Sequence, residues 1–159
     1  MSTLITVNDF INSGLPVSDD IRTEEIQFAI KTVEKTYLKN FIGAELYKQL
    51  IDSPTDYSNL LNETDYTNGI KHSEYEMVFA WLMYDRMRLT RYASVIKDDE
   101  HSTDPSEDDI MSICSMHWES ALENIIETLL ANDLEPADEV TPQPPFAELL
   151  FKYYNKHKR

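Results

Sequence analysis

Apolar residues recur along this chain mostly at helical spacing, and one stretch near the middle, 73–97, contains a run that is apolar on every side. Every residue from Met77 to Tyr84 is apolar or aromatic, and a helix that is apolar all round is a buried one. The run is too short, and too soon interrupted by charged residues, to cross a bilayer. Ser73 and Glu76 have the spacing of a capping box, which predicts a helix start at Ser73. We expect a central helix, walled by other helices over its first half and partly solvated over its second.

The N-terminal half predicts an arm and two helices. Residues 1–17 favour a short strand or arm followed by one helical turn. Caps and acidic residues at 18–20 and 23–25 then indicate a helix start, and an apolar stripe extends that helix to 40–43, where Gly43 is expected to take a left-handed cap. A shorter helix over 44–51 ends at a Ser-Pro pair. A polar loop over 56–69 follows, with three possible anchors: Tyr57, Leu60 and Leu61.

The C-terminal part predicts one long helix and a tether. The helix starts with Ser106 as its cap and ends at Asn132-Asp133. It has an inward stripe at Ile110, Cys114, His117 or Trp118, Ala121, Ile125 and Leu129. Residues 134–145 contain four of the seven prolines and predict an extended linker, and 146–159 predicts a short amphipathic helix with a basic end. The fold class is therefore all-α, a small helical bundle around a central buried helix with a Pro-rich C-terminal arm ending in a short helix. Its domain is 1–133, with its core at 18–132, and the tether and tail are 134–159.

Charge narrows the possible functions. The 159 residues include 14 Lys and Arg against 29 Asp and Glu, a net charge of −15, which argues against sequence-reading of DNA or RNA. The same charge suits a protein that mimics DNA or lines a passage through which DNA slides. Residues 98–109 carry seven acids and no Lys or Arg, typical of a solvated loop or, less often, of a site for a basic partner or a cation. The single Cys114 cannot form an internal disulfide and fits a reducing compartment, and the N-terminus lacks the pattern of a secretion signal.

Motifs for catalysis or metal binding are missing from the sequence. None of the four histidines stands in HExxH or Glu-x-x-His, and a packed histidine is the better interpretation of His117. Three glycines cannot build a phosphate loop, and no G-x-S-x-G elbow occurs. We therefore expect no catalytic residues, no metal site, no cofactor and no enzymatic activity.

Two groups of residues are candidates for interfaces. Arg86, Arg88 and Arg91 follow the all-apolar run; on a helix the last two share a face, and pairing within the bundle is favoured over a contact across a subunit boundary, where Arg is enriched. The second group is the aromatic and apolar side of the tail: Phe146, Leu149, Leu150, Tyr153 and Tyr154. This tail either folds back on its own domain or reaches a neighbouring acidic subunit.

The order of these parts resembles the head–tail connector (adaptor) proteins of tailed bacteriophages, most of all the ring proteins of crAss-like gut phages. The similar stretches are SDD (18–20), IQFAIKTVEKTYLKNFIGAELYKQL (26–50) and WLMYDRMR (81–88). Within them, Tyr37-Leu38 precedes a G-x-x-L-Y-x-x-L turn that begins at Gly43 and ends at Leu50. The resemblance covers 18–132 by layout, and the tether and tail are not part of it.

The resemblance implies an all-helical subunit assembled as a ring, commonly of twelve, below the portal. Its partners would be identical subunits, the portal protein, tail or further ring proteins, and passing DNA that is not read in sequence. Its location would be the virion, after synthesis in the host bacterial cytoplasm, with no membrane involved. A structural virion protein is therefore the leading hypothesis. An acidic helical binding protein, a DNA mimic or adaptor that sequesters a basic partner, is the alternative, and an enzyme comes third.

Overall fold

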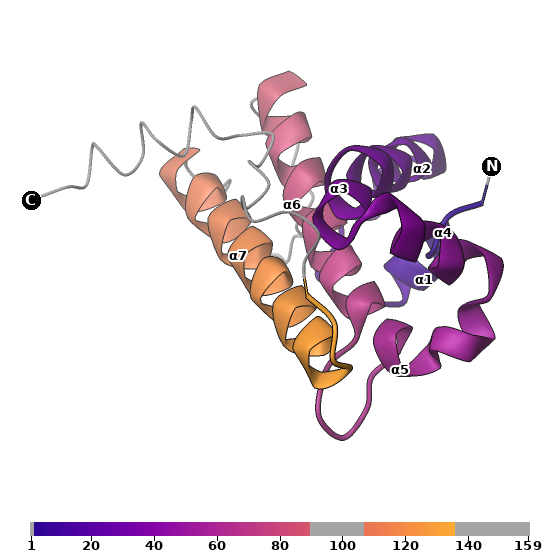
Figure 1. Ribbon diagram of the computed structural model, residues 1–159. Helices are drawn as coiled ribbons and strands as arrows, with labels where there is room; N and C mark the ends of the chain where they lie inside the picture. Colours follow the sequence, from indigo (N-terminus) through magenta and orange to yellow (C-terminus); the bar gives the residue numbers. More distant parts are fainter. Residues whose placement is uncertain (1, 90–106, 136–159) are drawn as a thin grey trace, which may run out of the picture.

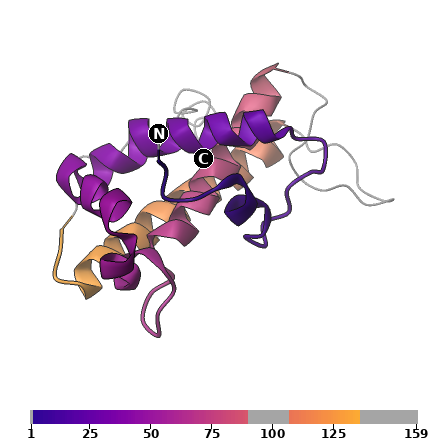
Figure 2. The same ribbon diagram turned by 90° about the vertical axis from the view of Figure 1, so that its right-hand side faces the viewer.

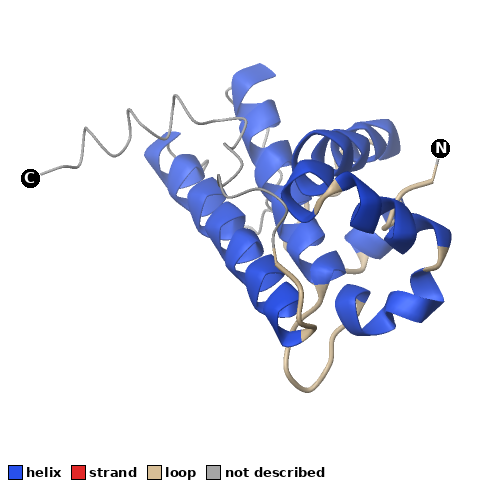
Figure 3. Ribbon diagram, viewed as in Figure 1, coloured by secondary structure: helices blue, strands red, loops and turns tan. Residues whose placement is uncertain are grey.

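The computed structural model describes residues 2–89 and 107–135, without the side chains of 86–89 and 107–108. Every regular element in these ranges is helical (Figure 3), which confirms the all-α prediction. The elements are α1 (Val7–Ile11), α2 (Thr23–Thr32), the π-helix η1 (Val33–Leu38), α3 (Lys39–Ile42), α4 (Ala44–Asp52), the 3₁₀-helix η2 (Pro54–Tyr57), α5 (Ser58–Leu61), α6 (Ile70–Leu89) and α7 (Glu107–Ala131). The predicted end of the central helix (90–97), the acidic loop and the Ser106 cap (98–106), and residues 136–159 of the tether and tail lie outside the described residues.

Helix α6 lies at the centre of the described structure. All seven residues from Met77 to Met83 are at most 9% exposed, and Tyr84 is partly buried. Helix α7 runs antiparallel along one side of α6 (Figure 1), and α2 with η1 covers another side, as Figure 2 shows from the side. The prediction of a buried central helix walled by its neighbours is confirmed for the first half of the run.

The capping box predicted at Ser73 is wrong. Helix α6 begins at Ile70, so Ser73 is already inside it. The Ser73 hydroxyl accepts a hydrogen bond from Asn124 Nδ2 at 2.6 Å, and the Glu76 carboxylate faces two side chains of α7. A Ser and a Glu three residues apart share one helix face, and here both residues use that face for contacts with α7 instead of for a cap.

Helix α2 and its continuation differ from expectation at both ends. The N-cap is Arg22, which makes no side-chain capping bond, so Thr23 is the first helical residue and not the cap. The helix passes through the π segment η1 and into α3, and it stops at Ile42, inside the predicted range. Gly43 has φ +99° and ψ 141°. The φ is positive, as predicted, but the ψ is not that of a left-handed cap.

The remaining connections largely follow the pattern of the sequence. An arm (2–6) leads into α1, whose capping box joins Thr6 and Asp9. The polar 56–69 stretch is more ordered than a loop, because η2 and α5 form helical turns within it, and it is anchored by buried Leu60 and Leu61 and partly buried Tyr57. Helix α7 ends where predicted: Asp133 has φ +59°, and the Leu134 N–H donates to Leu129 O at 2.8 Å, a helix-ending motif that satisfies an orphan carbonyl.

Candidate functional site

The structure leaves the predicted interface residues untested. Arg86 and Arg88 lie in the last turns of α6, but their side chains are outside the described residues, as is all of Arg91. The tail residues also lie outside the described residues: Phe146, Leu149, Leu150, Tyr153 and Tyr154. These eight positions therefore stay predictions, and the described residues offer other polar and apolar groupings to consider.

The most unusual polar feature is a pair of glutamates in the core. Glu34 on η1 and Glu74 on α6 are both fully buried. The Leu4 N–H donates to both carboxylate oxygens of Glu34, at 2.9 and 3.1 Å, and the Tyr47 hydroxyl donates to Glu34 Oε1 at 2.6 Å. Buried carboxylates are rare unless such donors surround them. Glu34 therefore ties the N-terminal arm and α4 to the π-helix, a helix type that is often found at functional sites.

Glu74 holds the proton of this pair. Burial raises the pKa of Glu74 well above its usual value; a hydrogen bond to Glu34 and the charges of Glu34 and Asp9 raise it further, while Lys71 opposes the shift. No N–H or O–H group of the described residues reaches the two Glu74 oxygens, so an ionised Glu74 would be buried without a donor. Two adjacent carboxyls cannot both ionise in a low dielectric. A protonated Glu74 that donates to Glu34 satisfies both groups.

Tyr47 and Lys35 close the cluster on its outer side. The Lys35 ammonium donates to the Tyr47 hydroxyl at 3.1 Å and lies 4.8 Å from the centre of the Tyr47 ring. Burial raises the pKa of Tyr47, and its hydrogen bond to Glu34 adds to the shift. The phenol therefore stays protonated and donates. Because both carboxyls are fully buried, no substrate reaches them, and their role in this geometry is to join four chain segments.

The sequence contains a weak signal for this cluster. Glu34 follows Ile30 by four residues and precedes Leu38 by four, which places a carboxylate in the middle of an apolar helical stripe. A carboxylate at a core-facing position predicts that a buried group of the same protein forms a hydrogen bond or an ion pair with it. The partner itself, Glu74, and the N–H of Leu4 come from distant parts of the chain and could not be identified by spacing.

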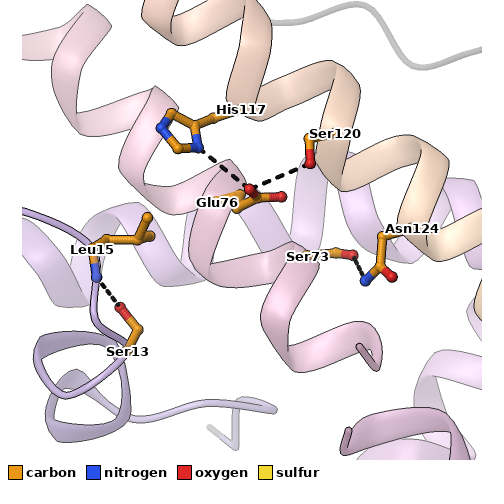
Figure 4. A network of polar contacts seen from close by, with 7 residues as sticks. All are labelled: Ser13, Leu15, Ser73, Glu76, His117, Ser120 and Asn124. Carbon is orange, nitrogen blue, oxygen red and sulfur yellow. Dashed lines mark hydrogen bonds and ion pairs between the residues drawn. The ribbon is translucent and has the colours of Figure 1, made fainter. Parts of the chain in front are cut away.

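A second polar cluster lies between α6 and α7 (Figure 4). His117 Nδ1 lies 3.4 Å from Glu76 Oε1, and the Ser120 hydroxyl donates to the same oxygen at 3.4 Å. The His117 ring also packs edge-on against Phe79, which confirms the prediction of a packed histidine. In a catalytic Ser–His–acid arrangement the hydroxyl bonds the imidazole. Here both groups point to the carboxylate, so the geometry is that of a helix–helix contact.

Asn124 fixes the register of the same two helices. Its amide Nδ2 donates to Gly69 O at 2.9 Å and to the Ser73 hydroxyl, as Figure 4 shows for the Ser73 contact. The Ser13 hydroxyl in the same figure accepts a 3.5 Å bond from the Leu15 N–H in the N-terminal segment. These contacts bind chain segments to each other.

The surface of the described residues carries several large apolar side chains. On α2, Phe28 is 64% exposed beside a hollow of about 340 Å³ lined by Thr23, Glu24, Gln27 and Lys31. On α7, Met116, Ile126 and Leu130 are exposed. In residues 2–89 and 107–135, no group of three His, Cys, Asp or Glu side chains is placed to hold a metal ion. Within the same ranges, no helix combines the length and the apolar character that a membrane span needs.

Comparisons with known proteins add no identification. No protein-family model matches the chain, and neither a curated protein nor a solved structure matches it.

Proposed function

We propose that this protein is a structural virion protein, a subunit of a head–tail connector ring between portal and tail through which the genome passes. The observation that supports it best is the packing of α6. Its apolar run is enclosed by α7 on one side and by α2 and η1 on another. The buried polar groups around it, Glu34, Glu76 and Asn124, bond to other parts of the chain. A subunit held this tightly is suited to carry load in an assembly.

The charge of the chain supports the same proposal. A ring of subunits at −15 each presents a negative wall to DNA, which limits adhesion during passage and reads no sequence. Like-charged subunits need apolar contacts to stay together. Exposed Phe28, Met116 and Leu130 are the kind of side chain that supplies such contacts. The predicted partners are identical subunits, twelve by resemblance, with the portal above and tail or further ring proteins below.

The arrangement of ionisable groups favours a structural role over a catalytic one. The buried Glu34–Glu74 pair is closed to substrates, and the Glu76 cluster lacks a contact between serine and histidine. Each cluster links elements that are far apart in sequence. Stabilising the fold is therefore a sufficient role for each cluster.

An acidic binding protein that sequesters a basic partner is the second candidate. One observation favours it: Glu119, Glu123 and Glu127 lie exposed along a single face of α7, and a continuous acidic face is what a DNA mimic presents to a nucleic-acid-binding protein. Three exposed apolar residues interrupt this acidic face. That mixture fits an interface with an amphipathic protein segment better than a surface that imitates phosphates.

Electron microscopy of the purified full-length chain tests the proposal. Rings of identical subunits with an open centre, which do not retain double-stranded DNA at physiological salt, are expected. A monomer that instead captures a basic DNA-binding protein from a defined mixture would overturn the proposal and support the second candidate. The same preparation answers both questions, because the two candidates differ in mass and in partner.

A further inference from the structure

One face of α7 is exposed along its length. Counting from Met116 in steps of three and four residues, it contains Met116, Glu119, Glu123, Ile126, Glu127 and Leu130, all of them exposed. We call these residues the α7 outer face. Met116 and Leu130 are 57% and 58% exposed, although both are apolar. The opposite face, with Cys114, Ala121 and Ile125, is buried in the core. Figure 1 shows α7 at the edge of the described structure, with α6 on its inner side.

The α7 outer face combines apolar and negative side chains. Glu123 and Glu127 alternate with Ile126 and Leu130 over two turns, and α7 contains no Lys or Arg at all. An apolar strip bordered by carboxylates is complementary to a partner segment with an apolar side and several cations. A neutral apolar peptide would leave the carboxylates desolvated. Nucleic acid would be repelled.

Residues 146–159 of the same chain have that complementary chemistry. They include the apolar residues Phe146, Leu149, Leu150 and Tyr153, and four basic residues against one acid give a formal charge of +3. As a helix they would be about 21 Å long, and the distance along α7 from Met116 to Leu130 is also about 21 Å at 1.5 Å per residue. The sizes match as well as the charges.

We propose that the α7 outer face binds residues 146–159 of a neighbouring copy of this chain, so that each subunit is strapped to the next. This inference rests on the proposed ring, in which the next copy lies beside each subunit. The ten residues 136–145 between the last described residue and the segment span at most about 35 Å when extended, enough to cross a subunit boundary. Four of these ten are proline, a composition that favours an extended spacer over a reversal onto its own helix.

Disulfide trapping in the full-length chain tests this proposal. Two chains are co-expressed, one with Glu123→Cys and the other, which has an added size tag, with Tyr153→Cys; their shared assemblies are purified and oxidised. The native Cys114 is buried against Ala80 and does not compete. Glu45→Cys on α4, also an exposed glutamate, replaces Glu123→Cys in the matched control. We expect a cross-link between the two different chains at least about fivefold above that control.

Two results would overturn the proposal. One is a yield no higher than in the Glu45→Cys control; the other is a chain with both Glu123→Cys and Tyr153→Cys that closes only on itself, which places the segment in cis. Adding Glu127→Lys to the Glu123→Cys chain should lower the yield several-fold, whereas Glu45→Lys, at an exposed site on α4, should not. Light scattering on the same samples separates this proposal from the ring: rings without the cross-link contradict only the strap, and cross-linked chains without rings contradict only the proposed function.

Discussion

The Glu74 carboxyl group lies beside the Glu34 carboxyl group, and both side chains are fully buried. This contact joins the central helix α6 to the π-helix η1, residues 40 positions apart in the sequence. It is stable only if one of the two groups keeps a proton, and burial together with the neighbouring charge places that proton on Glu74. The folded protein therefore carries a titratable group whose pKa is higher than in the unfolded chain.

Replacing Glu74 with Gln should make stability less dependent on pH. Above pH of about 4.5 the unfolded chain releases the Glu74 proton, while the folded protein keeps it, so wild-type stability falls as the pH rises towards the folded pKa. Gln donates a similar hydrogen bond to Glu34 without titrating. Urea unfolding between pH 5 and 8 should show the free energy of unfolding of wild type falling relative to that of Glu74→Gln, by up to about 1.4 kcal/mol for each pH unit. Parallel stability profiles for the two proteins would contradict the assignment of the proton.

The Tyr47 hydroxyl should contribute much more to stability than an exposed hydroxyl does. Tyr47→Phe removes the 2.6 Å donor from buried Glu34 and should lower the free energy of unfolding by about 1.5–3 kcal/mol, the usual value for a hydrogen bond to a charged group. Tyr57→Phe removes the 3.0 Å bond to Gln49 at an exposed site and should cost less than about 0.5 kcal/mol. Chemical denaturation of both variants gives the comparison, and equal losses would mean that the Glu34 cluster adds nothing.

Gly69 and Gly14 form a matched pair for testing the entry to α6. Both have positive φ, +86° and +91°, but a Cβ at Gly69 would lie 2.6 Å from Asn62 C and Leu61 O, whereas at Gly14 it meets nothing within 4 Å. Gly14→Ala should therefore cost only the backbone strain, about 1–2 kcal/mol. Gly69→Ala should cost clearly more, because backbone atoms must move. Thermal unfolding measures both, and a smaller loss at Gly69 than at Gly14 would show that the Gly69 turn relaxes freely.

Cys114 should be inert in the folded protein. Its thiol is buried, lies 3.5 Å from Ala80 O, and has a pKa that burial raises to about 12. Since the thiolate is the reactive form, an aromatic disulfide reagent at pH 8 should label native protein at least about a hundredfold more slowly than protein unfolded in urea. Rapid labelling of native protein would indicate that α7 separates from α6 far more often than such packing allows.

Local patterns predicted most of the fold and little of the candidate sites. The burial of the run from Met77 to Met83 could be predicted without knowing its neighbours, because a helix without polar residues is a buried one. The role of Ser73 and Glu76, in contrast, depends on distant residues, so their spacing was misleading. Their partners Asn124 and His117 lie on another helix, and a capping box and a shared helix face have the same three-residue period.

The Glu34 cluster and the π-helix illustrate the limit more generally. A π segment has no hydrophobic period of its own over six residues, so the sequence predicts one regular helix up to 40–43. The partners of Glu34 are a backbone N–H near the N-terminus, a tyrosine on α4 and a second glutamate on α6. Only tertiary structure brings these groups together. The interface residues predicted at Arg86, Arg88, Arg91 and in the tail stay predictions.

The mass of the full-length chain in solution decides most directly whether it is an assembly subunit. Multi-angle light scattering coupled to size-exclusion chromatography should give a single species at an integral multiple of 18.5 kDa, large enough for a closed ring and unchanged on dilution over about tenfold. A species at 18.5 kDa at every concentration and salt tested would contradict a self-assembling ring.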